Sequence, residues 1–382
     1  MRNLLIKGGQ IYQEGAFVKA DILCENGRIT EIGDLHARPC PNVIDASGKK
    51  VVPGFIDIHT HGGCGVDVNQ AGQEGLRKLS AFFASQGTTS FQASVLTDTP
   101  ETTVSCLSDA RAVMTDGAPG AQLLGVHLEG PFLAPAYKGA MPEHLLRKGD
   151  PALLRGWLDQ FPGVIRYMTV SPEVEGVIPL IRAFKDEIVI AIGHSGATCA
   201  QAAEAIEAGA RSATHLFNAM RPIHHHEPGI VGAALNSDCR CEMICDGRHL
   251  HPETIRLILR CIGYDRAVAI TDSIMAAGLP DGQYKLGIND VIVRDGDATL
   301  PETGVRAGST LTAINALRNL IAFTKEPLEK ILPLLTANPA SLLRIADHKG
   351  FLRAGYDADL VLLDDTLNVC STIVGGKIAY QA

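Results

Sequence analysis

Short apolar runs alternate with amphipathic stretches through the middle of the chain. In the amphipathic stretches, apolar residues recur at i, i+3 or i+4, which predicts helices such as those over 73–85, 199–208 and 252–261. The apolar runs predict eight strands, over 55–59, 88–95, 124–128, 164–170, 188–193, 212–215, 243–245 and 267–271. Eight strand-then-helix units predict an α/β fold of the (β/α)8 TIM-barrel type. A doubly wound open sheet has nearly the same pattern and stays open as an alternative.

Both ends of the chain lack the helical pattern and alternate over shorter distances. Turn sequences such as Glu25-Asn26-Gly27 and Gly375-Gly376 separate short predicted strands. These strands cover 4–6, 20–24, 28–32, 43–44 and 51–52 at the start, and 359–363, 372–374 and 377–380 at the end. Neither end has enough strands to bury a face alone. We therefore predict a small β-sandwich domain from residues 1–53 and 349–382, and a barrel domain over 54–348.

Composition and charge narrow the class of partner. The 382 residues are 46% hydrophobic and 20% charged, which is typical of a folded protein. The formal net charge is -8 and there is no long Lys/Arg run, so we expect a small-molecule partner and neither nucleic acid nor a membrane. The first apolar run breaks at Lys7, which makes it too short for the apolar core of a signal peptide. The 10 cysteines form no C-x-x-C pair. Both observations favour a cytoplasmic location with reduced thiols.

Side chains that can bind a metal follow on five of the predicted strands. They are His59, His61, Glu129, His194, His215 and Asp272. A barrel enzyme builds its site at the carboxyl ends of its strands, so these side chains are expected to meet at one rim. His59 and His61 stand two residues apart on a strand, so both rings point to the same face. His127 would add a fifth imidazole to this rim.

Imidazole and carboxylate ligands predict a divalent cation, with zinc first and iron, manganese or cobalt as alternatives. Glu129, His194 and His215 would leave a tetrahedral ion one open position, as in catalytic sites. The second oxygen of Glu129 could bridge to another ion beside the His59/His61 pair, so we expect one or two ions per subunit. Asp272 is placed to accept a proton from water and pass it to a leaving group.

Several motifs, in order and spacing, closely resemble the N-acetylglucosamine-6-phosphate deacetylases of the amidohydrolase superfamily. The resemblance covers essentially the whole chain. The matching segments are PGFIDIHTHG at 53–62, HLEGP at 127–131, GHS at 193–195, THLFNAM at 214–220, EPG at 227–229, DG at 246–247, TD at 271–272, AGSTL at 307–311 and ANPA at 337–340.

This resemblance implies a metal-dependent barrel, usually a homodimer, that removes acetyl from an amino-sugar phosphate. By position, Glu129, His194 and His215 would be the primary ligands, and Asp272 the catalytic acid/base. The His59/His61 pair would hold a second metal that only some members have. Residues implied to line the sugar phosphate are Asn218, Ala219, His249, Ala307, Gly308 and Ser309.

Two positions depart from the family pattern. The family usually has Arg directly before Glu-Pro-Gly, where it binds phosphate, but this chain has His226. It also usually has His in a Lys-Gly-x-His stretch near the acetamide, whereas here Ala140 is followed by Met141. Imidazole does not match the planar fork of Arg and is only partly charged at pH 7. We expect both stretches near the substrate, and we hypothesise that Arg248 supplies the missing charge.

The sequence therefore predicts a hydrolase that converts N-acetylglucosamine 6-phosphate to glucosamine 6-phosphate and acetate in amino-sugar catabolism. The same chemistry on N-acetylgalactosamine 6-phosphate or on an unphosphorylated N-acetyl hexosamine stays open, as does another amidohydrolase reaction. A metal-stabilised binding module is the alternative from a different class. It would have a closed coordination sphere and no use for Asp272.

Overall fold

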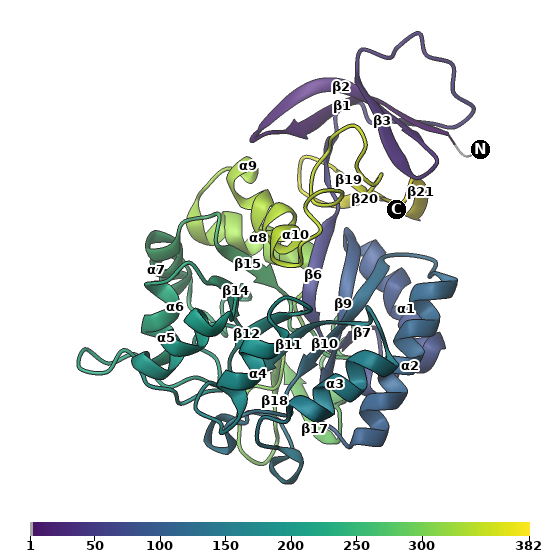
Figure 1. Ribbon diagram of the computed structural model, residues 1–382. Coiled ribbons are helices and arrows are strands. Elements are labelled where there is room, and N and C mark those ends of the chain that lie inside the picture. Colours follow the sequence, from purple (N-terminus) through teal and green to yellow (C-terminus); the bar gives the residue numbers. More distant parts are fainter. Residues whose placement is uncertain (1–2) are drawn as a thin grey trace.

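Eight parallel strands form the centre of the molecule (Figure 1). The structure is a computed structural model that describes residues 3–382. In spatial order the strands are β15 (Ala267–Ile270), β14 (Arg240–Ile244), β13 (Ser212–Ala213), β12 (Val189–Ile192), β11 (Ile165–Val170), β10 (Gln122–Glu129), β9 (Thr88–Leu96) and β6 (Phe55–Thr60). At the seam the Asp272 N–H donates to the His59 carbonyl at 2.9 Å, and Thr60 bridges to Ser273. The strands therefore close on themselves, which confirms the barrel over the open sheet.

Helices surround the barrel and separate its strands along the chain (Figure 1). The three helices predicted by range correspond to α1, α5 and α7, and Thr198 caps the start of α5 in a capping box with Gln201. The helices are α1 (Gly72–Ser85), α2 (Pro100–Asp116), α3 (Pro151–Gln160), α4 (Val177–Phe184), α5 (Cys199–Ala208), α6 (Gly229–Leu235), α7 (Pro252–Ile262), α8 (Ala313–Thr324), α9 (Leu328–Ile331) and α10 (Ala337–Leu342). Short 3-10 turns add η1 (Val68–Gln70), η2 (Pro135–Tyr137), η3 (Glu143–Leu145) and η4 (Leu332–Leu335).

Strands from both ends of the chain form a second, mixed sheet at one end of the barrel (Figure 1). Its members are β21 (Lys377–Gln381), β20 (Val369–Val374), β19 (Leu360–Leu363), β5 (Lys50–Pro53), β1 (Leu4–Gln13), β2 (Ala16–Glu25) and β3 (Arg28–Gly33), with β4 (Val43–Asp45) beside β1. The sheet curls so that its two outer hairpins approach each other. Ala358 donates to the carbonyl of Gly27, between β2 and β3, and accepts from the N–H of Gly376, between β20 and β21. The predicted β domain from both termini is thus confirmed as a fold, while its exact boundaries stay a prediction.

A three-stranded sheet that the sequence pattern did not predict follows the last barrel strand. It contains β16 (Gly282–Leu286), β17 (Asn289–Arg294) and β18 (Asp297–Thr299), and a small pair, β7 (Gly62–Gly63) with β8 (Val66–Asp67), follows the first barrel strand. The apolar side chains Leu286, Val291 and Val293 of this sheet pack against Leu96 and Met141. The sheet therefore lies over the residues that follow strands β9 and β10.

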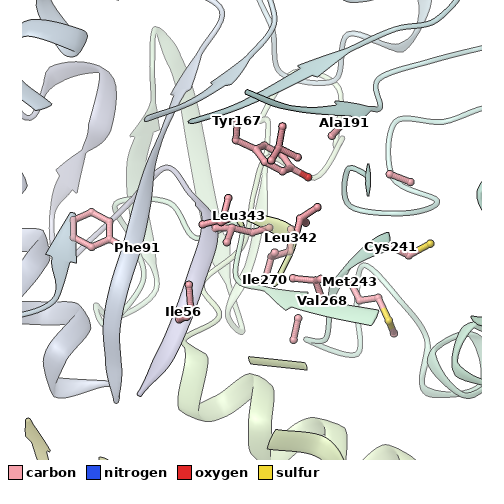
Figure 2. Close-up of a cluster of buried hydrophobic side chains, with 14 of the residues drawn as sticks. Ile56, Phe91, Tyr167, Ala191, Cys241, Met243, Val268, Ile270, Leu342 and Leu343 are labelled. Carbon is pink, nitrogen blue, oxygen red and sulfur yellow. The ribbon is translucent and has the colours of Figure 1, made fainter. Parts of the chain in front are cut away.

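The barrel strands share a continuous apolar core, and polar side chains such as Gln92, Thr169 and Glu242 are fully buried beside it. Figure 2 shows the strand side chains Ile56 and Ile270 near Leu342 and Leu343 at the end of α10, with Phe91 further away. Cys239, Cys241 and Cys245 are buried free thiols, as expected of small apolar residues around a strand. Within the described residues, no helix has the length and apolar character needed to cross a membrane.

Candidate active site

The six predicted metal-binding and acid/base residues come together at one end of the barrel. Glu129 is the last residue of β10, and His59 lies within β6, one residue before its end. His194, His215 and Asp272 each stand two residues beyond the end of β12, β13 and β15, respectively. These are the carboxyl ends of parallel strands, where barrel enzymes place their functional groups.

Glu129 is shared between two pairs of histidines. Its Oε1 lies 3.1 Å from His194 Nε2 and 3.2 Å from His215 Nε2, while its Oε2 lies 3.2 Å from His61 Nε2. His59 Nε2 is 3.4 Å from Glu129 Oε1. In each of the two resulting groups, all three ligand atoms lie within 4.8 Å of one another. The arrangement can hold a single cation in one of the two groups, or two cations, one in each group.

The hydrogen bonds on the far sides of the rings test whether these residues fit a cation. The Nδ1 of His194 faces the Tyr137 carbonyl at 2.9 Å, and the Nδ1 of His61 faces the Ser94 carbonyl at 3.1 Å. A carbonyl only accepts, so each Nδ1 carries the proton and each Nε2 turns a lone pair inward. His194 Nε2 and His215 Nε2 lie only 3.1 Å apart beside a carboxylate. Two ring nitrogens this close to each other and to one carboxylate fit a shared cation, so the donor set suits a metal.

Asp272 completes the cluster from the last barrel strand. Its Oδ1 lies 3.2 Å from His61 Nε2 and 3.5 Å from His59 Nε2. The carboxylate is buried among these imidazoles, yet it also lines the cavity above them. It can therefore reach both the metal-binding groups and a bound ligand.

Three site residues adopt left-handed backbone conformations, which are costly for residues other than glycine. The φ angles are 48° for His194, 28° for His215 and 49° for Asp272. Hydrogen bonds hold two of them there. The His215 N–H donates to Glu242 Oε2 at 3.2 Å, and the Asp272 carbonyl accepts the Ser309 N–H at 2.7 Å. This strain turns the side chains toward one point instead of along the strands.

The electrostatics of the cluster favour positive charge. Burial raises the pKa of Glu129, but His59, His194 and His215 oppose it and hold that pKa well below its ordinary value. Burial lowers the pKa of His61, whereas Asp272 and Glu129 raise it to about 9 overall. The carboxylates therefore stay ionised and attract a proton or a cation to the facing ring nitrogens.

His127, counted from the sequence as a fifth imidazole at the rim, lies outside both metal-binding groups. Its Nδ1 is 2.9 Å from Ser94 Oγ, and its Nε2 is 2.8 Å from Thr169 Oγ1. Burial and the nearby His59 hold the pKa of His127 well below its ordinary value. It is thus a neutral, hydrogen-bonded ring beneath the site.

Sequence reasoning missed two buried acidic residues that support the cluster. Glu242 on β14 contacts His59 Nδ1 at 3.0 Å, and Asp57 Oδ2 accepts the Thr271 hydroxyl at 2.6 Å. Burial raises the pKa of Asp57 to about 6. Asp57 carried an available signal, because a lone acidic residue inside an apolar strand has to find a partner when it is buried. Glu242 carried none, because the strand was predicted over 243–245 whereas β14 begins at Arg240.

A cavity of about 720 Å³ lies above the cluster. Predicted substrate residues that line it are Asn218, Ala219, His249, Ala140, Met141, Ala307 and Gly308. The other three predicted substrate residues are not in its wall. Ser309 donates its hydroxyl to the Thr271 carbonyl at 2.6 Å, and His226 is exposed on a loop. Arg248 donates to the Asp295 carbonyl.

Two other cationic side chains stand in the cavity wall. Arg306 forms two hydrogen bonds to the Asp297 carboxylate, at 2.9 and 3.0 Å, which leaves its other N–H groups available. Lys138 donates to the Met141 carbonyl at 3.3 Å. Neither residue was predicted to bind substrate, although Lys138 belongs to the Lys-Gly-x-His stretch and Arg306 directly precedes the AGSTL segment.

The chain is similar to known proteins over nearly its whole length. Residues 50–379 match the Amidohydrolase family. The chain is 38% identical to N-acetylglucosamine-6-phosphate deacetylase of Bacillus subtilis (strain 168), covering 99% of this chain and 97% of that protein. It is 36% identical to N-acetylgalactosamine-6-phosphate deacetylase of Escherichia coli O157:H7, with 89% and 91% covered.

A solved structure shows the same likeness in three dimensions. A mutant N-acetyl-D-glucosamine-6-phosphate deacetylase from Mycobacterium smegmatis, in complex with N-acetyl-D-glucosamine-6-phosphate, superposes with a TM-score of 0.93. The two chains are 32% identical, and all of each chain is covered. The similarity thus extends over the barrel and the terminal sheet together.

Proposed function

The chain belongs to the amidohydrolase family, and we propose that it hydrolyses the N-acetyl group of N-acetylglucosamine 6-phosphate. The products would be glucosamine 6-phosphate and acetate, as in amino-sugar catabolism. The observation that carries this proposal is the shared Glu129 between two histidine pairs, with Asp272 beside it, at the floor of a cavity with room for a hexosamine phosphate. The full-length likeness to deacetylases supports the same assignment.

Residues of both histidine pairs would hold the metal. Glu129, His194 and His215 form the first group, and Glu129 with His59 and His61 forms the second. A divalent cation bound there supplies Lewis acidity that activates water and polarises the amide carbonyl. Nitrogen and oxygen ligands suit zinc first, with iron, manganese or cobalt as alternatives, and one or two ions per subunit.

Asp272 would transfer the proton that amide hydrolysis requires. Its carboxylate takes a proton from the attacking water as the new C–O bond forms. It then delivers that proton to the amide nitrogen, so that the C–N bond breaks and the amine and acetic acid form. The acid then passes its proton to the amine, which gives acetate and the ammonium form of the sugar. Before the reaction, the lowered pKa of Asp272 keeps its carboxylate ionised, which is the form that can accept a proton. Burial raises the pKa of Asp272, but His59 and His61 bring it below its ordinary value.

The rest of the cavity would hold the sugar. Asn218, Ala219 and His249 line one part, and the backbone at Ala307 and Gly308 lines another. The ring of His249 is oriented by Asp246 Oδ2, which lies 2.7 Å from its Nδ1. For the phosphate, the cavity offers Lys138 and Arg306.

Oligomeric state and location complete the proposal. We propose a homodimer, as the resemblance of the sequence implies. His226 is exposed on its own chain and outside its own cavity, so any contact that it makes with substrate would be in the cavity of the partner subunit. A cytoplasmic location stays a prediction from the sequence.

N-acetylgalactosamine 6-phosphate is the second candidate substrate, because one relative bears that activity in its name. The test is acetate release from a panel of phosphorylated and free N-acetyl hexosamines, with bound metal measured in parallel. We expect the fastest release from N-acetylglucosamine 6-phosphate. Faster turnover of the galactose epimer or of a free sugar would transfer the assignment to that substrate, and no release from any member would refute deacetylation.

A further inference from the structure

Glu242 is a buried carboxylate in the middle of barrel strand β14, and its side chain is 0% exposed. Its Oε2 faces His59 Nδ1 at 3.0 Å and the His215 backbone N–H at 3.2 Å. Its Oε1 accepts the hydroxyl proton of Tyr167. The backbone N–H can only donate, so Oε2 of Glu242 acts as a hydrogen-bond acceptor on the side that faces His59.

We propose that Glu242 is a positioning residue. It orients His59 so that the His59/His61 half of the site binds a second divalent cation. The inference rests on the proposed function only in that this function requires a first cation at Glu129, His194 and His215. It says nothing about which sugar is hydrolysed.

The contact between Glu242 and His59 decides which ring nitrogen of His59 faces the site. A carboxylate beside Nδ1 holds the proton on that nitrogen, so the Nε2 lone pair of His59 turns inward. There it lies 3.2 Å from His61 Nε2, whose own lone pair also faces inward. Without the Glu242 charge, His59 could carry its proton on Nε2 and donate it to Glu129 or Asp272. A proton between His59 and one of these carboxylates would then take the place of the second cation.

The net charge of the buried cluster also favours a second cation while Glu242 is a carboxylate. Three carboxylates face the imidazole nitrogens, namely those of Glu129, Asp272 and Glu242. One divalent cation leaves one negative charge on this cluster, and a second cation leaves one positive charge. If Glu242 were neutral, the second cation would bring the buried cluster to two positive charges, which is costly in a low-dielectric interior.

The effect of Glu242 on metal binding is confined to the His59/His61 half of the site. Glu242 contacts His215 through its backbone N–H, and the Nδ1 of the His215 ring has no hydrogen-bond partner. The tautomer of His194 is set by the Tyr137 carbonyl. In Glu242→Gln the amide oxygen can still accept the His215 N–H, so the backbone of the first group keeps its support, and the loss of charge acts on His59 of the second group.

Metal stoichiometry tests the inference directly. Chelated wild-type protein and the isosteric, uncharged Glu242→Gln variant are dialysed against rising free zinc, and bound zinc per chain is measured by atomic emission. We expect two ions in the wild type. In the variant we expect one ion with unchanged affinity and a second whose affinity falls roughly 10–100-fold. Glu187→Gln, a surface carboxylate paired with Arg155, is the matched control and keeps both ions.

A spectroscopic readout distinguishes loss of an ion from general damage. After loading with manganese(II), the wild type is expected to show the spin-coupled EPR signal of two neighbouring ions. The variant is expected to show an uncoupled signal under the same conditions. Two ions of wild-type affinity in Glu242→Gln would overturn the inference, as would a wild type that holds only one ion at saturation.

If Glu242→Gln fails to fold, the wild type alone still decides. With 15N-labelled histidine, NMR of the zinc-loaded protein is expected to show His59 protonated at Nδ1, and protonation at Nε2 would overturn the inference. Acetate release by the same preparations separates the two proposals. A one-ion wild type that deacetylates refutes only the role of Glu242, and a two-ion wild type without deacetylation refutes only the proposed function.

Discussion

At the scale of single residues, the backbone around Asp272 fixes the acid/base group. The Asp272 N–H donates to the His59 carbonyl, and the Asp272 carbonyl accepts the Ser309 N–H at 2.7 Å. These two bonds tie the residue to the first barrel strand on one side and to the AGSTL segment on the other. They maintain its strained φ of 49°, so the carboxylate reaches the cavity floor without any rearrangement.

Replacing Asp272 with asparagine tests its proposed role in proton transfer. The amide keeps the shape of the side chain but cannot accept a proton from water, so turnover should fall by about 10²–10⁴-fold. Zinc content and the Kd for N-acetylglucosamine 6-phosphate should change little. Steady-state kinetics with metal analysis and calorimetry measure these quantities. Turnover near that of wild type would disprove the role.

We expect Arg306, which stands in the cavity wall, to recognise the phosphate group of the substrate. Arg248 donates to the Asp295 carbonyl and lies outside the cavity wall. Arg306→Ala removes a charged donor, which is worth about 1.5–3 kcal/mol in a hydrogen bond, so KM for the 6-phosphorylated sugar should rise roughly tenfold or more. KM for the free sugar should stay the same. Arg248→Ala is the matched control. A larger rise in KM from Arg248→Ala than from Arg306→Ala would restore the hypothesis drawn from the sequence.

At the scale of elements, the sequence pattern predicted the barrel because each strand and helix there has a strong period of its own. Strand β12 is apolar throughout, and α7 has a continuous apolar face, so neither requires knowledge of distant residues. The sheet of β16, β17 and β18 was missed for the opposite reason. Its strands are short, and their apolar faces are completed by Leu96 and Met141, far away along the chain.

The same distinction explains which site residues could be predicted. His59, Glu129 and the other ligands follow recognisable strands, so local pattern was enough to bring them to one rim. Glu242 could not be assigned a partner, because His59 lies 183 residues away and the contact exists only across the closed barrel. Arg248 was chosen for its place beside a motif, but hydrogen bonding within the fold directs it elsewhere.

Gly308 tests how the segment after β18 supports the site. Its φ is +61°, and an added Cβ would lie 2.4 Å from Ile274 Cγ2 and 2.9 Å from the Asp272 carbonyl oxygen. Gly308→Ala should therefore destabilise the fold by about 1–3 kcal/mol and also reduce kcat by moving Asp272. Thermal unfolding and kinetics measure the two effects.

The matched control is Gly156→Ala in the exposed part of α3, where an added Cβ meets no atom within 4 Å. This change should stabilise the fold by about 0.5–1 kcal/mol without changing kcat. Unchanged kcat in Gly308→Ala would contradict the proposed support of Asp272.

At the scale of the whole molecule, one buried ion cluster ties the terminal sheet to the segment that leaves the barrel. Lys349 Nζ lies 2.6 Å from Asp359 and 3.0 Å from Asp357, and Asp357 also pairs with Arg28 at 3.1 Å. The cluster thus joins residues from both ends of the chain. Burial lowers the pKa of Lys349, but Asp359 and Asp357 raise it above its ordinary value of 10.5 overall.

Lys349→Met leaves two carboxylates without their buried cation, so we expect a loss of about 3–5 kcal/mol in the free energy of unfolding near neutral pH. Because the pKa of Lys349 is raised by folding, its contribution is fully present below pH 10.5 and is lost as pH rises through the folded value. The difference between variant and wild type should therefore shrink only in strong alkali. Lys285→Met, in an exposed pair, is the control. A difference that grows with alkalinity would contradict this assignment.

The central claim is that imidazoles and carboxylates from separate strands hold a divalent cation on which amide hydrolysis depends. Titrating the chelated protein with zinc, while following acetate release from N-acetylglucosamine 6-phosphate, measures it most directly. We predict no detectable release before zinc is added and a rise that follows bound zinc until the site is full. Full turnover by the chelated protein, or zinc binding without any release, would contradict the account.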